Sequence, residues 1–205
     1  MMEAESPPEI LQIYRDFPRP GCEDAFRAVE EDAARVCTEL RFPHAHLAIE
    51  SLIGPKEVWW LNAFDSEAER QQVTRDYTDN PAVVRALEEI GRRRQDLVGT
   101  PIDVLARRRP GSSERAAWRL AGARFFVVDV TRGEPPTWGT VFEAPDGTNY
   151  ILRPVRTARE AERLGGDAGG GARVFAVRPY WGMPAKEWIA ADREFWRVNP
   201  AAASA

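Results

Sequence analysis

The sequence holds few of the residues on which disulfide frameworks, metal centres and nucleophilic catalysis depend. Of its 205 residues, only two are cysteine and two are histidine. Two cysteines cannot form the disulfide framework of a small secreted domain. No serine lies in a Gly-x-Ser-x-Gly turn, and the glycine-rich stretch GGDAGGG (165–171) lacks the lysine of a phosphate-binding loop. These absences argue against a serine hydrolase and against a P-loop nucleotide-binding protein.

Long apolar runs and an excess of basic charge are also missing. No run approaches the roughly 18 apolar residues of a membrane span, and the N-terminus does not resemble a signal peptide. The formal net charge is -4, so the chain has no basic field that would gather nucleic acid. We therefore expect a cytoplasmic protein whose partners include neither nucleic acid nor membrane.

The first half of the chain has the pattern of a mixed α/β unit. Apolar residues recur at steps of three and four after Glu23, which predicts an amphipathic helix. Ser66 with Glu69 forms a capping-box pattern, with Asp65 as the alternative cap, and Asn80 followed by Pro81 marks another helix start. The predicted strands are 9–17, 44–53, 57–64 and 101–109, and the predicted helices are 23–40, the segment after Ser66, and 80–97. Two of the strands form a hairpin, and the β-α-β-β-α-β order is that of a ferredoxin-like fold.

The second half repeats the strand-rich theme less regularly. Its predicted strands are 123–130, 139–144, 149–155 and 173–181, and its predicted helices are 157–164 and 184–196. We therefore predict an α+β protein with a ferredoxin-like domain at 1–109, a linker at 110–115 and a second, related sheet domain at 116–205 packed against the first.

Three stretches of the first half resemble the dimeric α/β-barrel superfamily. They are LQIYRDFPRPG (11–21), WWLNAFDSEAERQQV (59–73) and NPAVVRAL (80–87). The resemblance is to the NIPSNAP-like and antibiotic-biosynthesis-monooxygenase-like branches. It implies a dimeric α/β-barrel-like fold and relatives that include cofactor-free oxygenases, haem-degrading enzymes and chlorite-dismutase relatives. The second half would supply the sheet that a partner subunit supplies there, so a homodimer and a pseudo-dimer within one chain both stay open.

The two histidines are the first candidates for chemistry. His44 and His46 stand two apart, so a strand would place both on one face, with Glu50 farther along that face. The pair could ligate a metal with Glu50, or one histidine could transfer a proton near neutral pH. Both could equally mark the half-exposed start of a strand. We therefore predict no bound metal.

The aromatic strand 57–64 supplies the other candidates. Alternation puts Trp60 and Asn62 on one face and Trp59 on the other, so both faces should be covered. An amide such as Asn62 among apolar groups could bond a nearby loop or orient a ligand carbonyl. The predicted catalytic residues are His44, His46, Asn62 and Tyr14. The predicted ligand-pocket residues are Trp60, Phe64, Tyr77 and Trp181.

These residues suggest two functions of different class. The first is an enzyme that binds a small apolar or aromatic molecule beside the sheet and acts as a cofactor-free oxygenase or isomerase. The second is a non-catalytic module that binds a ligand or a protein, suggested by the tryptophan-rich segment 184–196. We expect no cofactor. Haem in particular needs an apolar slot and an axial histidine, and the only two histidines begin a strand.

Overall fold

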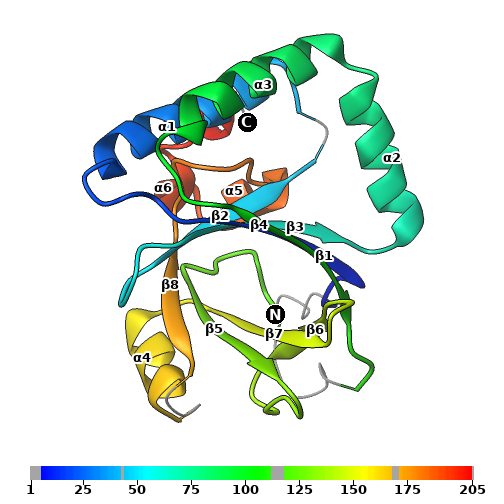
Figure 1. Ribbon diagram of the computed structural model, residues 1–205, viewed down its shortest axis with the longest axis vertical. Coiled ribbons are helices and arrows are strands. Elements are labelled where there is room, and N and C mark those ends of the chain that lie inside the picture. The colour runs from blue at the N-terminus through cyan, green and yellow to red at the C-terminus, as the bar shows by residue number, and fades with distance from the viewer. Residues whose placement is uncertain (1–5, 43, 112–117, 168–170, 205) are drawn as a thin grey trace.

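The computed structural model describes residues 6–42, 44–111, 118–167 and 171–204 (Figure 1). The elements of the first half are β1 (Ile10–Asp16), α1 (Glu23–Glu39), β2 (His46–Ser51), β3 (Val58–Phe64), α2 (Glu67–Thr78), α3 (Pro81–Gln95) and β4 (Ile102–Arg108). Those of the second half are β5 (Phe125–Arg132), β6 (Thr140–Glu143), β7 (Thr148–Val155), α4 (Ala158–Asp167), β8 (Arg173–Val177), α5 (Lys186–Ala191), α6 (Arg193–Trp196) and the 3-10 helix Pro200–Ser204.

All eight strands join into one closed antiparallel barrel in the order β1-β3-β2-β8-β5-β7-β6-β4. The first half contributes β4-β1-β3-β2, which is the ferredoxin-like order, and the second half contributes the matching order β8-β5-β7-β6. The halves meet at two seams, where β2 pairs with β8 and β4 pairs with β6. Closure leaves neither sheet with a free edge strand.

The two sheets therefore join edge to edge and enclose one shared core, which specifies how the second sheet packs against the first. Both seams run between the same positions of the two halves, the second strand of one and the fourth of the other. An approximate twofold relation between the halves follows from this pairing. The predicted linker at 110–115 lies mostly outside the described residues, so the proposed domain boundaries stay a prediction.

The alternation along β3 is as predicted. Trp59 and Leu61 point into the barrel, where they join the main core cluster, whereas Val58 and Trp60 pack in a second cluster under α1. Trp59 is fully buried and Trp60 nearly so. Figure 1 shows α1 and α3 lying together on the outside of the first sheet, and α4 lying beside the second. Both faces of β3 are thus covered, as its apolar composition requires.

The C-terminal helices complete the core of the barrel. Trp188 and Ile189 of α5 and Trp196 of α6 are buried in the same cluster as the inward-facing side chains of the strands. Trp118, which precedes β5, packs there against Phe126 and Phe142. This segment is broken: Asp192 leaves helical geometry between α5 and α6 and accepts a hydrogen bond from the Phe195 backbone N–H. The prediction of one helix over 184–196 was therefore wrong, because an aspartate cap starts a new helix there.

The helix starts of the first half are as predicted. The Ser66 hydroxyl accepts a hydrogen bond from Glu69 N (3.1 Å), and the Glu69 carboxylate accepts one from Asp65 N (2.7 Å). Asn80 caps α3 through Val83 N, with Pro81 at the first helical position. Ser66, not Asp65, is the N-cap of α2. Among the described residues, each helix is too short or too polar to cross a lipid bilayer.

Candidate functional site

The outer face of the first sheet gathers most of the predicted site residues. In the strand register, His46 of β2 lies opposite Asn62 of β3. On the other side of β3, Asn62 lies opposite Gln12, and Trp60 lies opposite Tyr14 of β1. Directly opposed residues of an antiparallel pair share a face, with Cβ atoms about 5 Å apart. Three of the four predicted catalytic residues are thus neighbours on one surface.

Part of this surface is open to solvent although it lies on central strands. The Tyr14 side chain is 38% exposed, and Gln12 and Asn62 are partly exposed. The helix that follows β3 does not seal the face, since α2 has no buried residue. Beneath α1, in contrast, Phe26, Trp60 and Trp181 pack tightly together. The outer layer therefore grades from a closed apolar end into an open polar one.

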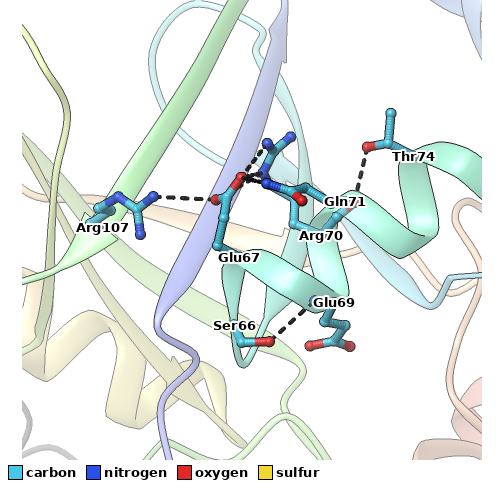
Figure 2. A network of polar contacts seen from close by, with 7 residues as sticks. All are labelled: Ser66, Glu67, Glu69, Arg70, Gln71, Thr74 and Arg107. Carbon is cyan, nitrogen blue, oxygen red and sulfur yellow. Dashed lines mark hydrogen bonds and ion pairs between the residues drawn. The ribbon is translucent and has the colours of Figure 1, made fainter.

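A polar network ties the first turn of α2 to β4 (Figure 2). Glu67 accepts hydrogen bonds from Arg70 and Gln71 within the helix, and from Arg107 Nη2 of β4 at 3.2 Å. The hydrogen bonds from Arg70 and Gln71, with the charges of Arg70 and Arg107, lower the pKa of Glu67 to about 2. Its negative charge also suits a helix N-terminus. The start of α2 is thus tied to the sheet edge, while the rest of the helix borders the open face without burying a side chain.

The two histidines are held as neutral rings at the edge of this face. The His44 ring stacks on Phe64, with ring centroids 4.5 Å apart, and forms a hydrogen bond with the backbone of Ala63. Its Nε2 is buried and has no partner among the described residues. Burial lowers the pKa of His44 and lowers that of His46 to about 4. Both imidazoles are therefore uncharged at neutral pH and can accept a proton or a hydrogen bond.

Tyr14 and Asn62 contribute a donor and an amide. Burial and the nearby Asp103 raise the pKa of Tyr14, so its phenol stays protonated near neutral pH. The Tyr14 hydroxyl oxygen accepts a hydrogen bond from Gln12 Nε2 at 2.6 Å, which leaves its own O–H available as a donor. The Asn62 amide makes no hydrogen bond with any described residue. A hydrogen bond from Asn62 to a neighbouring loop, one of the two predicted roles, is therefore not seen within the described residues.

The predicted pocket aromatics lie around the same layer but not in one place. Trp60 contacts the His46 ring at 6.3 Å between centroids and Trp181 at 6.1 Å. Tyr77 of α2 contacts Phe42, which in turn contacts His46. Phe64 lies beneath His44. Trp181 also packs against Phe26 of α1, so it belongs to the closed end of the layer.

A buried acidic pair in the closed end was missed by the sequence reasoning. Asp16 and Glu30 are both nearly inaccessible, and Arg94 Nη1 lies 3.2 Å and 3.4 Å from their carboxylate oxygens. Trp60 Nε1 donates to Asp16 Oδ2 at 2.9 Å. Burial raises the pKa of Glu30 to about 7, although Arg94 opposes the shift. One signal was available: Glu30 follows Phe26 by four residues and precedes Ala34 by four, within the buried stripe of α1.

Glu50 is not placed to complete a metal site with the histidines. It forms ion pairs with Arg178 and with Lys56 (2.9 Å), on the part of β2 nearer the hairpin turn. Within the ranges that the structure describes, no group of three histidine, cysteine or acidic side chains could hold a metal ion. Cys37 is buried, and burial with the charge of Glu30 raises the pKa of its thiol to about 12.

Comparison with known proteins finds likeness in structure but not in sequence. No family model matches the chain, and no curated protein matches it. A proposed monooxygenase from Fusobacterium nucleatum is 9% identical with a TM-score of 0.51, over 87% of this chain and 94% of that one. A proposed monooxygenase from Lactobacillus acidophilus is 6% identical (TM-score 0.46), over 83% of this chain and 94% of its own.

A NIPSNAP family protein of unknown function from Agrobacterium tumefaciens covers a smaller part of the chain. It is 18% identical with a TM-score of 0.39, over 52% of this chain and 93% of that one. The first comparison extends the likeness across most of the barrel, beyond the half that the sequence motifs cover. At these identities the likeness concerns the fold alone. The chain thus has a fold similar to that of the Fusobacterium nucleatum protein, with both sheets of the barrel in one chain.

Proposed function

We propose that the first half of the barrel binds a small apolar or aromatic molecule on the open outer face of its sheet. The observation that carries this proposal is the partly exposed set of Tyr14, Asn62 and Gln12 on two central strands. Such positions are normally covered when helices pack on a sheet. Polar groups beside an aromatic surface are usual in a small-molecule site, and here the open polar end borders the aromatic cluster of Phe26, Trp60 and Trp181.

The chemistry that these groups support is removal of a proton next to a carbonyl or from a phenol. His44 offers an unpartnered Nε2 on a ring oriented by a backbone hydrogen bond, so it is assigned as the proton acceptor. Tyr14 and Asn62 would donate hydrogen bonds to the oxygen on which negative charge develops. This step begins both a keto–enol isomerisation and a cofactor-free oxygenation.

A tricyclic phenol with an acidic C–H, such as 1,8-dihydroxyanthrone, is a suitable probe. Titration calorimetry would measure its binding, and loss of the C–H proton signal in deuterium oxide would measure proton removal. His44→Gln should abolish exchange, whereas Asn62→Ala and Tyr14→Phe should each slow it by about tenfold or more. Asp129→Asn, on the outer face of the second sheet, is the matched control and should change neither. Exchange that persists in His44→Gln would contradict the assigned role.

A non-catalytic binding module is the second candidate, and the low pKa of His46 favours it. With a pKa of about 4, this imidazole is a weak base and suits an orienting hydrogen bond better than proton removal. This alternative predicts that the probe binds, that Asn62→Ala weakens binding, and that no variant or wild-type protein accelerates exchange. The tryptophan-rich segment no longer supports a protein-binding role, because Trp188 and Trp196 pack inside the barrel.

A further inference from the structure

One mouth of the barrel carries a cluster of charges that the proposed site does not use. Arg15 of β1 and Arg173 of β8 both face the barrel interior and both bond to Glu57, at 3.1 Å and 2.7 Å. Glu57 is buried and also accepts a hydrogen bond from Trp59 Nε1 at 2.7 Å. Burial alone would raise the pKa of Glu57, but Arg173, Trp59 and Arg15 hold it below its usual value.

The cluster has one more positive charge than negative. Among the described residues, Glu57 is the only acid within ion-pair distance of either arginine. Arg15 stacks over Trp59 with its Cζ 4.8 Å from the ring centroid, and its buried Nε has no partner among the same residues. Arg173 lies over Phe175 at 5.2 Å. Two guanidinium groups held on aromatic faces thus share a single carboxylate, and a partly buried charge without a counter-ion is costly.

One exposed apolar side chain lies beside Arg15, and another lies in the turn between β2 and β3 that leads to Glu57. Ile102 of β4 is directly opposite Arg15 and is 38% exposed. Across the other seam, Leu52 N donates to Val174 O at 2.9 Å, and Ile53 follows Leu52 in the bend that leads from β2 towards Glu57. Ile53 is 75% exposed. The arginines themselves remain reachable, with side chains 14% and 29% exposed.

We propose that this mouth binds the carboxylate of a small amphiphile, such as a medium-chain fatty acid. The head group would pair with Arg173 and Arg15 and compensate the surplus charge, in the bidentate geometry that guanidinium favours. The apolar chain would lie along Ile102, opposite Arg15, and remove its surface from water. The site draws on both halves of the chain, so it exists only when the barrel is closed. It lies inside the strands, whereas the face of the proposed function lies outside them.

Titration calorimetry of the full-length protein with octanoate at constant ionic strength tests the proposal. Octanoate should bind, and acetate should bind at least tenfold more weakly because it lacks the chain. Arg173→Gln should weaken octanoate binding at least tenfold. Glu57→Gln should tighten it severalfold, because the amide still accepts from Trp59 but no longer competes for the arginines. A tighter complex is a result that a purely structural role for Glu57 does not produce.

Controls separate this site from other sources of affinity. Arg92→Gln removes an exposed arginine of α3 paired with Glu89 and should leave binding unchanged. Asn62→Ala should also leave it unchanged, because that residue belongs to the outer face. The proposal fails if octanoate does not bind, or if Arg173→Gln binds it as well as wild type. It fails equally if octanol matches octanoate, which would show an apolar surface alone, or if inorganic phosphate binds more tightly than octanoate.

Discussion

The two halves of the barrel have the same strand order but differ in what lies outside the strands. In the first half, the connection between the first two strands contains the 17-residue α1, and α3 packs beside it. In the second half, the corresponding connection between β5 and β6 spans only residues 133–139, all described and none helical. The outer cluster of the second half is accordingly small and centres on α4.

This difference separates two tasks. The first half keeps a helical layer outside its sheet. Both histidines, the buried acids and the open polar face lie on that outer side of the sheet. The second half supplies β6 and β8, which close the barrel, and the C-terminal tryptophans that fill it. In a symmetric pair of subunits, each sheet would carry the same layer. In a single chain that contains both sheets, the outer layers of the two sheets can differ. We therefore expect one outer site per chain.

The strongest test of the shared interior is Trp196→Ala. Trp196 is almost fully buried in the barrel core, so its loss should reduce the free energy of unfolding by about 3–5 kcal/mol. Urea denaturation measures this, and Val198→Ala, an exposed neighbour, should change stability by less than about 0.5 kcal/mol. Light scattering should give a monomer mass for wild type and variant, since both seams are satisfied within the chain. A dimer that dissociates on Trp196→Ala would mean that this residue serves an interface.

A pair of acids compares the two outer layers. Asp16→Ala should cost about 1–3 kcal/mol, because it leaves the Trp60 indole N–H without its acceptor in a buried position. Asp129 lies on the outer face of β5 and makes no hydrogen bond with described residues, so Asp129→Ala should cost less than about 0.5 kcal/mol. Equal losses in the two variants would contradict the unequal roles assigned to the layers.

The caps of two helices give a smaller and finer comparison. Ser66→Ala should reduce the free energy of unfolding by about 1 kcal/mol, since the Ser66 hydroxyl caps Glu69 N. Thr157→Ala removes the corresponding hydrogen bond to Glu160 N (3.2 Å) at the start of α4. α4 buries Ala161 and Leu164, whereas α2 buries no residue. Loss of the cap should therefore increase local opening more at α2 than at α4. Hydrogen exchange of the amides of α2 and α4 would measure both responses.

The last comparison concerns pH, and the effect arises in the first half alone. Glu30 has a pKa of about 7 in the folded protein against about 4.5 unfolded, so its contribution to stability falls as pH rises through that window. His46 has a pKa of about 4 folded against about 6.5 unfolded, so its contribution rises with pH between those values. The two slopes oppose each other between about pH 4.5 and 6.5.

Variants should separate these slopes. In Glu30→Gln, the free energy of unfolding should increase more steeply with pH than in wild type between about pH 4.5 and 6.5. Without His46, in His46→Gln, it should increase less steeply or decrease. Urea denaturation at several pH values measures both slopes, with His44 contributing in the same direction as His46 because burial lowers its pKa too. Identical slopes in the two variants would show that neither group titrates as described.

Much of the first half follows from local sequence. The caps at Ser66 and Asn80, the hairpin between β2 and β3, and the two covered faces of β3 depend on residues close together in the chain. Period and capping patterns report such features directly. The neighbourhood of Asn62 and His46 also follows, because a short hairpin fixes its own register. Tyr14 lies near them because β1 pairs with β3, and the ferredoxin-like strand order predicts that pairing.

Only the tertiary structure decided how the halves meet and which charges become buried. The seams β2–β8 and β4–β6 join residues more than 30 positions apart. The alternation of apolar and polar residues along a strand does not indicate which strand pairs with it across a seam. The Arg15–Glu57–Arg173 cluster exists because one of those seams brings β8 beside β2. Glu30 and Asp16 likewise meet Arg94 only when α1 and α3 pack over β1. Side-chain pattern encodes which face of an element is buried, but the partner on that face is set by long-range packing.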